Sequence, residues 1–508
     1  MLNKNKFQNF SQVLNYWAEK IPNKVFINDL SAGRKYSYSV FNSLVNQTAN
    51  LLIDQGVKPG DIVSIYLRNS IEFLLIYFAS IRIGSIINPI PLSVSKKELR
   101  AHLNFIQSKI VFVKDTDFKK ESEKYLVYPV KFSSEDSLIN RLKQFSANKT
   151  SHDLGDNDMA FLYCSSGTTS KPKGIIFDHQ GIMNVIASTC RGFGHSGETV
   201  HLAILPMAHT SVMHYSLLPA LYSGGSYLLA ENFMKISRNF WQIIEKYKVS
   251  YVQTVPTIIF LLLNINYPDY SRNKIVLPYL ACGSAPLPVE RQKVFGKKFG
   301  LPVVNLYGLS EAGHLTADYP FENRKIGSIG KPFDIVDLKI LGDDGQEVPV
   351  GETGEIAVKT SGFFRGYYKD EKLYESCLKN GYFCTGDLGR KDKDGWYYFV
   401  DRKKDLIVKA GVNISPNLID EVLIKHQAVV ESASVGISDE FFGEVIKSYV
   451  VLNPEKEIAE EDLIKYCQAE LGRFKSPSKI EFISQLPKTA SGKILKRKLR
   501  QGEFLKSL

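Results

Sequence analysis

Two hydrophobic patterns alternate along the first part of the chain. Residues 38–54 and 70–82 place apolar side chains at helical spacing. Short apolar runs typical of buried strands lie between and after these segments, at residues 62–66, 110–113, 249–255 and 302–307. Strands that alternate with helices indicate a layered α/β architecture with largely parallel sheets.

The pattern changes near residue 335, where short strands and tight turns replace the helices. Turns that contain glycine occur at residues 343–345, 351–354 and 393–396, as in β-hairpins. A charged stretch at residues 401–405 then separates this region from a last unit of mixed helix and strand. We therefore predict an α/β protein of two domains. The first, residues 1–401, contains layered α/β subdomains and a β-rich subdomain at about 335–401, and the second, residues 402–508, is a small mobile α+β domain.

The composition indicates a cytoplasmic globular protein. With 508 residues the chain is too long for one core, and 44% apolar and 23% charged residues are ordinary values. The six cysteines are scattered and include no C-x-x-C pair, which argues against a zinc site and a disulfide framework. The most apolar stretch, residues 73–89, is interrupted by Arg82 and Gly84. It predicts a core helix and strand rather than a membrane span.

The net charge of +11 is densest near the C-terminus, between Lys488 and Arg500. Such a basic segment fits a nucleic acid, a membrane surface or an anionic small ligand. Aromatic residues do not interleave with these charges, so stacking on nucleic-acid bases has no support. We expect no nucleic-acid partner and no integral membrane segment.

The most informative segment is residues 163–174, Tyr-Cys-Ser-Ser-Gly-Thr-Thr-Ser-Lys-Pro-Lys-Gly. It follows a strand-like run at residues 159–163, and its hydroxyls, backbone N–H groups and lysines suit phosphate oxygens. It is not a Walker loop, because no Gly-Lys-Ser/Thr follows four residues after a glycine. Taken alone, the segment is more typical of a polar surface turn.

Five further segments change that balance. They are residues 206–210 (Pro-Met-Ala-His-Thr), 282–286 (Cys-Gly-Ser-Ala-Pro), 306–311 (Leu-Tyr-Gly-Leu-Ser-Glu), 382–387 (Tyr-Phe-Cys-Thr-Gly-Asp) and 487–493 (Pro-Lys-Thr-Ala-Ser-Gly-Lys). In order and spacing the six segments resemble the adenylate-forming, or AMP-binding, superfamily, on its acyl-CoA synthetase and coumarate–CoA ligase branch. The resemblance runs from about residue 10 to about residue 500. It implies ATP, Mg²⁺ and coenzyme A as cofactors or co-substrates.

The resemblance also assigns roles to individual residues. It implies catalytic roles for Lys493, His209 and Thr168, Mg²⁺ ligation by Glu311 and Thr168, and a domain hinge at Lys404. The residues that it implies for ATP or AMP are Ser165, Ser166, Gly167, Thr168, Thr169, Lys173, Gly283, Ser284, Ala285, Asn305, Tyr307, Gly308, Ser310, Asp387, Arg402 and Lys493. Ser170 stands where relatives usually carry a glycine.

The chemistry of these residues suits the implied roles, although each has a plainer interpretation. Tyr307 would stack on adenine, or be a core aromatic residue. Asp387 would accept the two ribose hydroxyls, since a carboxylate offers only acceptors. His209 would orient the substrate carboxylate, or be a satisfied core histidine. Lys493 would reach the α-phosphate, or be a solvated surface charge.

The substrate and the acceptor are less well defined. Residues 206–230 contain no Asp or Glu to pair with an ammonium group, which disfavours amino acids and favours an uncharged or apolar acyl or aromatic acid. Only residues 494–508 follow Lys493, so the sequence shows no fused carrier domain and favours free coenzyme A. A separate carrier protein and a non-catalytic scaffold remain as alternatives. The sequence leaves open whether the protein is a monomer or a homodimer.

Overall fold

The computed structural model describes residues 7–114, 124–133, 135–148, 150, 152, 154–155, 158–165, 173–320, 323–362, 364–489 and 492–502. Within these residues, two large sheets of mainly parallel strands form most of the N-terminal part, with antiparallel pairs at one edge of the first sheet and at both edges of the second. The first has the order β18 (Gly366–Tyr367), β8 (Lys173–Asp178), β7 (Met159–Ser165), β4 (Ile86–Pro89), β3 (Ile62–Tyr66), β5 (Ile110–Lys114) and β6 (Leu126–Val130). The second has the order β15 (Lys331–Pro332), β14 (Gly313–Ala317), β13 (Val303–Leu309), β12 (Leu280–Cys282), β11 (Tyr251–Thr254), β9 (Val200–Ala203), β10 (Ser226–Leu229), β1 (Val25–Asp29) and β2 (Arg34–Ser37).

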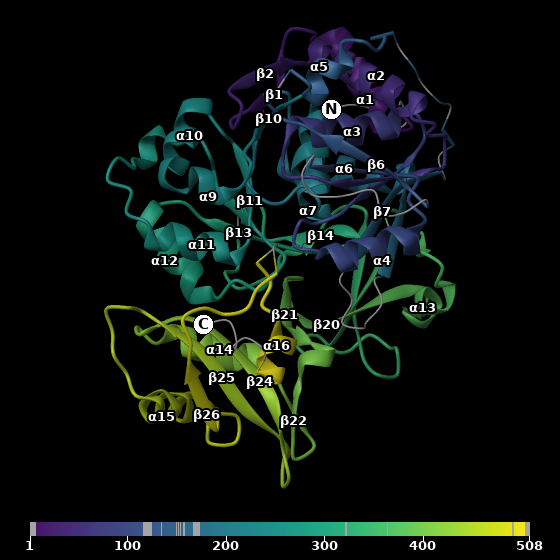
Figure 1. Cartoon of the computed structure of the whole chain (residues 1–508). Coiled ribbons are helices and arrows are strands. Elements are labelled where there is room, and N and C mark those ends of the chain that lie inside the picture. The colour runs from purple at the N-terminus through teal and green to yellow at the C-terminus, as the bar shows by residue number, and fades with distance from the viewer. Residues whose placement is uncertain are drawn as a thin grey trace.

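Helices connect these strands (Figure 1), and most of them pack into one extended hydrophobic core. They are α1 (Phe10–Lys20), α2 (Tyr38–Asp54), α3 (Ile71–Arg82), α4 (Lys96–Ile106), α5 (Leu138–Leu142), α6 (His179–Phe193), α7 (Thr210–Val212), α8 (Leu218–Ser223), α9 (Phe233–Ile236), α10 (Phe240–Tyr247), α11 (Pro256–Asn264) and α12 (Val289–Phe299). The π-helix η2 (Met213–Leu217) joins α7 to α8, and two 3₁₀ turns, η3 (Ser237–Asn239) and η4 (Arg272–Lys274), follow. The layered α/β architecture predicted from the hydrophobic pattern is confirmed.

The apolar stretch that contains Arg82 forms α3 and β4, all of whose residues are buried. The Arg82 side chain is satisfied inside the protein, because it donates hydrogen bonds to Asn46 (2.5 Å), Asn42 (2.8 Å) and Ser11 (3.0 Å). A buried guanidinium needs such partners. The prediction of a core helix and strand is confirmed, and no helix among the described residues is long and apolar enough to cross a membrane.

A β-rich region follows the second sheet. Its sheet has the order β16 (Val336–Leu341), β17 (Gly354–Thr360), β20 (Tyr382–Lys391) and β19 (Leu378–Lys379), with β21 (Tyr397–Arg402) paired to β20. Antiparallel pairing throughout fits the predicted hairpins. Between β17 and α13 (Glu371–Ser376) the chain leaves this region, and β18 pairs with β8 of the first sheet.

The C-terminal part has hydrophobic cores of its own. After the 3₁₀ turn η5 (Lys403–Asp405), its sheet has the order β23 (Val412–Ile414), β22 (Ile407–Lys409), β25 (Gly443–Leu452) and β24 (Val429–Asp439), with β26 (Lys479–Phe482) paired to β25. Its helices are α14 (Pro416–Lys425), α15 (Glu460–Leu471) and α16 (Lys496–Gln501). Figure 1 shows this unit, in yellow and green, below the rest of the molecule. The boundary at residues 401–402 stays our proposal, which the separate cores support.

Candidate functional site

Three of the predicted site residues contact one another at the edge of the β-rich region. The Tyr307 hydroxyl donates a hydrogen bond to Oδ2 of Asp387 (2.9 Å), and Nε of Arg402 lies 3.2 Å from Oδ1 of the same carboxylate. Asp387 and Tyr307 are 3% and 8% exposed. Burial raises the pKa of Asp387, and the neighbouring Arg402 and Tyr307 oppose that shift. Each carboxylate oxygen keeps a second lone pair that can accept a hydrogen bond from a further hydroxyl group.

The local backbone explains why Asp387 points into this site. Gly386 has φ = +75°, a conformation that favours glycine, and its N–H donates to the Glu355 carboxylate (2.9 Å). The Asp387 N–H donates in turn to the Thr385 hydroxyl (3.1 Å). The Thr-Gly-Asp sequence is therefore a bend fixed by side chains.

The segment after β12 approaches the neighbouring strand closely. A side chain at Gly283 would lie 3.0 Å from the Leu306 carbonyl, so the loop contacts β13 through its backbone. Ser284 has φ = +71°, which is uncommon for a residue other than glycine. Gly308 is equally constrained, because a Cβ there would lie 2.2 Å from the Gly313 carbonyl. A side chain at either glycine would therefore collide with the backbone of a neighbouring segment.

Asn305 supports the strand that carries Tyr307. Its amide donates to the Ser328 carbonyl (2.9 Å), and its backbone N–H donates to Asp318 (2.6 Å). Asn305 is 9% exposed. Both groups are thus used to tie β13 to the segment that follows β14.

Lys493 reaches the same place from the C-terminal part of the chain. Burial and the neighbouring Arg402 lower the pKa of Lys493, whereas the carboxylates of Asp387 and Glu311 raise it. The lysine thus interacts electrostatically with charged groups of the N-terminal part. Lys404 is a further neighbour that lowers the same pKa.

A short turn presents Lys493. The Thr489 N–H donates to the Lys493 carbonyl (2.8 Å), and the Lys493 N–H donates to the Thr489 hydroxyl (3.1 Å). Gly492 has φ = +82° and packs on Thr257 of α11, whose hydroxyl lies 3.4 Å from the Gly492 carbonyl. Gly492 therefore occupies a position where glycine is favoured and a side chain would be crowded.

Glu311 interacts with Tyr367 and with the charges of two lysines. It accepts a hydrogen bond from the Tyr367 hydroxyl (3.2 Å), and the Lys173 ammonium lies 5.5 Å from the centre of the Tyr367 ring. Burial raises the pKa of Glu311, and Tyr367, Lys493 and Lys173 lower it. No cluster of three or more possible metal ligands occurs among the described residues. A single carboxylate fits Mg²⁺, which binds through one or two carboxylates together with substrate phosphates.

His209 begins the α7–η2 helix and caps its first turn. Its Nδ1 accepts from the Ser211 N–H (3.3 Å) and lies 2.8 Å from the Ser211 hydroxyl. Nδ1 is therefore unprotonated, and the ring proton resides on Nε2. Burial and the nearby Lys493 lower the pKa of His209 to about 4. The side chain is then a neutral hydrogen-bond donor at pH 7.

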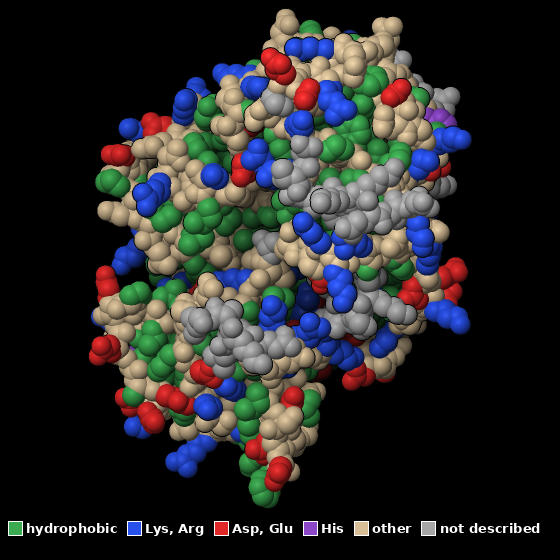
Figure 2. Space-filling model, in the orientation of Figure 1, with side chains coloured by type: hydrophobic (Ala, Val, Ile, Leu, Met, Phe, Trp, Pro, Cys, Tyr) green, Lys and Arg blue, Asp and Glu red, His purple; other side chains and the backbone are tan. Residues whose placement is uncertain are grey.

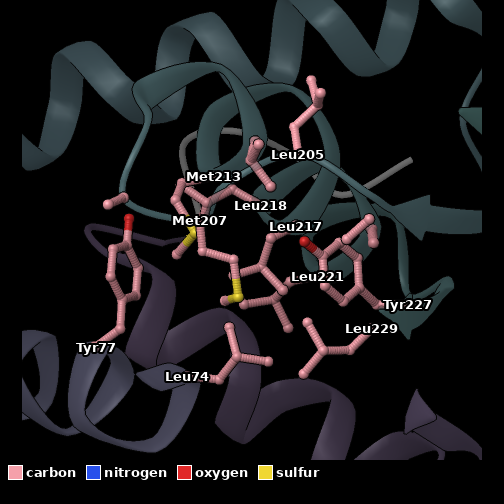
Figure 3. Close-up of a cluster of buried hydrophobic side chains, with 14 of the residues drawn as sticks. Leu74, Tyr77, Leu205, Met207, Met213, Leu217, Leu218, Leu221, Tyr227 and Leu229 are labelled. Atoms are coloured by element: carbon pink, nitrogen blue, oxygen red, sulfur yellow. The ribbon is translucent and has the colours of Figure 1, made fainter. Parts of the chain in front are cut away.

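The helix that follows His209 packs apolar side chains on one face and stacks Tyr215 on His314 on another. Figure 3 shows Met213 and Leu217 of this helix in a buried cluster with Leu74 of α3. The ring centres of Tyr215 and His314 are 3.4 Å apart, with an angle of 16° between the rings. The wall next to His209 is thus apolar and aromatic.

Comparison with known proteins identifies the family. The AMP-binding enzyme family matches residues 14–368, and the AMP-binding enzyme C-terminal domain matches residues 418–493. The chain belongs to the AMP-binding enzyme family. The resemblance drawn from the six sequence segments is confirmed.

Several known proteins are similar over nearly the whole chain. A sulfoacetate–CoA ligase of Cupriavidus necator is 30% identical, with 97% of each chain covered. A crotonobetaine/carnitine–CoA ligase of Citrobacter koseri is 27% identical, with 97% of this chain and 99% of the relative covered. ATP-bound MatB from Rhodopseudomonas palustris superposes with a TM-score of 0.90 at 26% identity and covers 97% of this chain and 99% of its own. An o-succinylbenzoate CoA synthetase from Bacillus subtilis, solved with its acyl-adenylate, has a TM-score of 0.84 at 26% identity and covers 96% of this chain and 97% of its own.

The structure brings together most of the residues that the AMP-binding family pattern suggested. Lys173, His209, Glu311, Tyr307, Asp387, Arg402, Lys404 and Lys493 are linked by the contacts and charge effects given above, and Ser310 directly precedes Glu311. The backbone of Ser165 pairs with Lys173 at the ends of β7 and β8. Between them, Ser166, Gly167, Thr168, Thr169 and Ser170 lie outside the described residues, so the proposed phosphate loop stays a prediction.

Sequence reasoning missed supporting residues that lie far from the motifs in the chain. Tyr367 connects Glu311 to Lys173, Glu355 fixes the turn at Gly386, and Thr257 contacts the Lys493 turn. These residues lie outside the six segments, and only the fold brings them to the site.

Proposed function

We propose that the protein is an ATP-dependent carboxylic acid–CoA ligase that forms an acyl-adenylate and then a thioester. The observation that carries this proposal is the position of Lys493. The charges of Asp387 and Glu311 of the N-terminal part raise the pKa of this lysine, and the lysine in turn lowers the pKa of His209. Asp387 is the proposed ribose ligand, Glu311 the proposed Mg²⁺ ligand and His209 the proposed contact to the substrate carboxylate. A cation that interacts with all three is suited to act at the α-phosphate.

In the first half-reaction a carboxylate oxygen of the acid attacks the α-phosphorus of ATP. The bond from that phosphorus to the bridging oxygen breaks, and pyrophosphate leaves with the electron pair. Lys493 would donate to the α-phosphate oxygens as negative charge develops on them. Nε2–H of His209 would donate to the substrate carboxylate and orient it. Mg²⁺ held by Glu311 would neutralise phosphate charge.

The nucleotide would be held by the contacts around Asp387. Its carboxylate would accept the ribose hydroxyls, while Arg402 and Tyr307 keep it oriented. The backbone at 283–285 and the Tyr307 ring would enclose the adenine. Lys173 and the hydroxyls of Thr168 and Thr169 would bind the departing pyrophosphate.

In the second half-reaction the thiol of coenzyme A loses its proton to solvent, and its sulfur attacks the acyl carbon of the adenylate. A carbon–sulfur bond forms, and the carbon–oxygen bond to AMP breaks. We propose that the small C-terminal domain rotates between the two steps about Lys404, which is exposed in η5 between β21 and β22, while Arg402 at the end of β21 stays paired with Asp387. Lys404→Pro would stiffen this turn and should slow thioester formation more than adenylation.

The proposed acid is uncharged or apolar at its far end. The helix wall beside His209 contains no acidic residue, and the first acid after it, Glu231, already pairs with Arg68 at 2.6 Å. A cationic acid such as carnitine would lack an ion-pair partner on this wall. The stacked Tyr215 and His314 favour flat or apolar acyl groups.

Exchange of labelled pyrophosphate into ATP with a panel of carboxylic acids tests the proposal. The panel contains aliphatic acids of increasing length, aromatic acids, sulfoacetate and crotonobetaine. Exchange with at least one uncharged acid is expected. Folded protein that binds MgATP but gives no exchange with any acid would favour a non-catalytic scaffold instead.

Mass spectrometry of products then identifies the acceptor. We expect acyl-CoA from the active acid, ATP and coenzyme A. A product that forms only on a phosphopantetheine carrier protein would assign the protein to carrier loading. A cytoplasmic location, inferred from cysteine usage, belongs to the same proposal.

A further inference from the structure

One arginine of the N-terminal part contacts the C-terminal part at a distance from the nucleotide site. Nη2 of Arg291, on α12, donates to the carbonyls of Val429 (2.5 Å) and Val430 (3.2 Å), where β24 begins. Figure 1 shows α11 and α12 at the end of the large domain that faces the C-terminal domain. Two carbonyls bound by one charged group form a strong interdomain contact.

The contact between Arg291 and β24 lies at the edge of a cavity between the two parts of the molecule. A cavity of about 400 Å³ lies beside it, lined by residues of both parts, including Phe260, Leu263, Val430 and Asn453. The Arg291 guanidinium lies 6.0 Å from the centre of the Phe260 ring, and its Nε is buried without a hydrogen-bond partner among the described residues. Packing around the guanidinium is therefore incomplete, and its carbonyl contacts hold the two parts together here.

A second contact lies on the same helix. α12 has no side chain that caps its N-terminus. The Glu421 carboxylate of α14 approaches the Val289 N–H at this end: burial raises the pKa of Glu421, and the Val289 N–H opposes that shift. A carboxylate at a helix N-terminus is favourable. The C-terminal part thus meets α12 at both Arg291 and Val289.

A chain of contacts leads from Arg291 to the Lys493 turn. Glu431, the next residue after Val430, pairs with Lys488 through both carboxylate oxygens (2.6 and 2.8 Å). Lys488 is bridged to Ile494 by backbone pairing and so forms the base of the turn that contains Lys493. The start of β24 therefore connects Arg291 to the catalytic turn. Figure 2 shows lysine and arginine side chains along the hollow between the two parts.

We propose that Arg291 is a positioning residue for the adenylation half-reaction. By holding the start of β24, it keeps the Glu431–Lys488 pair, and with it Lys493, in the orientation that reaches the nucleotide site. The contact must open when the C-terminal domain rotates for thioester formation, so it stabilises one of two orientations. This inference rests on the proposed two-step ligase function.

The half-reactions of Arg291→Met test the proposal. Pyrophosphate exchange should fall by about tenfold to a hundredfold, as expected for a lost charged hydrogen bond. Thioester formation from synthetic acyl-adenylate and coenzyme A should be unchanged or faster. Arg291→Lys should restore part of the exchange, and Lys293→Met, an exposed position on the same helix, should change neither step. Equal losses in both half-reactions of Arg291→Met would overturn the proposal.

A double variant tests whether Arg291 acts through Lys493. If it does, Arg291→Met combined with Lys493→Ala should be no slower in exchange than Lys493→Ala alone. Losses that multiply would show that Arg291 acts independently and would overturn the proposed route.

Limited digestion with trypsin gives a test that needs no substrate and so separates this inference from the ligase assignment. Lys403 and Lys404 are exposed at the junction of the two parts. Release of the C-terminal fragment, identified by mass spectrometry, should be severalfold faster in Arg291→Met than in Lys293→Met. Equal rates would contradict a holding role. If Arg291→Met does not fold, the rate of fragment release is compared between Arg291→Lys and Lys293→Met, and a smaller difference is expected.

Discussion

The two parts of the molecule contribute to the site in different ways. In the N-terminal part, the carboxylate of Asp387 is held by both Tyr307 and Arg402, and the backbone before it is fixed by Glu355. In the C-terminal part, Lys493 stands on a short turn that contacts the large domain through the weak Thr257 contact of 3.4 Å. One side is formed before any ligand binds, whereas the other depends on the orientation of a domain.

The N-terminal side is therefore suited to binding the nucleotide, and the C-terminal side to assisting one chemical step. A preformed site can hold the nucleotide through both half-reactions, because the adenylate and ATP share the same ribose. A cation that arrives with a domain can serve one step and leave for the next. Variants on the two sides should therefore differ in which half-reaction they affect as well as in size.

The largest effect is expected for Lys493→Ala. Loss of the ammonium group at the α-phosphate should slow pyrophosphate exchange by about 10²–10³-fold, corresponding to roughly 3–4 kcal/mol. Thioester formation from preformed adenylate should be spared, because Lys493 is assigned to the first step only. Exchange and single-turnover thioester assays measure the two effects.

An exposed lysine on α16 supplies the matched control. Lys498→Ala removes the same charge from the same domain without removing a group from the site, and it should leave both half-reactions unchanged. Unchanged exchange in Lys493→Ala would show that the lysine is only a surface charge.

Asp387→Asn should have the next largest effect, on both half-reactions. The amide loses the ion pair with Arg402 and places N–H groups where ribose donors and the Tyr307 hydroxyl need acceptors. We expect a rise in KM for ATP and a loss of about ten- to a hundredfold in each step, or roughly 1.5–3 kcal/mol. A loss confined to adenylation would mean that Asp387 acts on the α-phosphate rather than the ribose.

Acid should destabilise the N-terminal part through its buried histidines. Burial lowers the pKa of His102 and of His179 to about 4 and that of His195 to about 3. Their neutral forms are favoured in the folded state, so stability is full above the unfolded pKa of about 6.5 and falls as the pH drops toward the folded values. Each contributes a loss of about 1.4 kcal/mol per pH unit in that window. Asp318, whose pKa is raised to about 7, has the opposite effect: protonation of this carboxyl stabilises the folded state as the pH falls. It offsets the loss of stability caused by about one histidine.

Tryptophan fluorescence isolates this effect. The three tryptophans, Trp17, Trp241 and Trp396, all precede residue 402, so their emission reports unfolding of the N-terminal part. The urea midpoint measured by emission should fall between pH 7 and pH 5. His102→Asn should reduce the fall. A midpoint that does not change with pH would contradict the buried neutral state of these rings.

The sequence predicted the site better than it predicted what holds the site together. Helix spacing gave residues 38–54, which match α2, because the apolar face and the Ser37 cap are local features. The motif residues Asp387 and Lys493 could be named because their segments have recognisable order. Tyr367 and Arg291 could not, because each acts through a partner that is distant in the chain. Their roles depend on which strand edges and helix faces the fold brings together.

The tautomer of His209 is a similar case. The sequence placed a histidine near the substrate carboxylate and left its role open. Only the position of Ser211, which occupies Nδ1, shows that Nε2 carries the proton. The composition of the 206–210 segment does not contain that information.

The smallest predicted effect, that of Tyr307→Phe, tests how far the N-terminal side is preformed. The substitution keeps the ring that would stack on adenine and removes only the hydroxyl that donates to Asp387. Loss of one such bond should cost about 1 kcal/mol, or about a fivefold rise in KM for ATP with kcat unchanged. If Tyr307 is merely a core aromatic residue, the change will lower the melting temperature and leave KM unaltered. If KM and melting temperature both stay constant, Arg402 alone orients the carboxylate, and the nucleotide side then depends on a half-exposed ion pair much as the other side depends on Lys493.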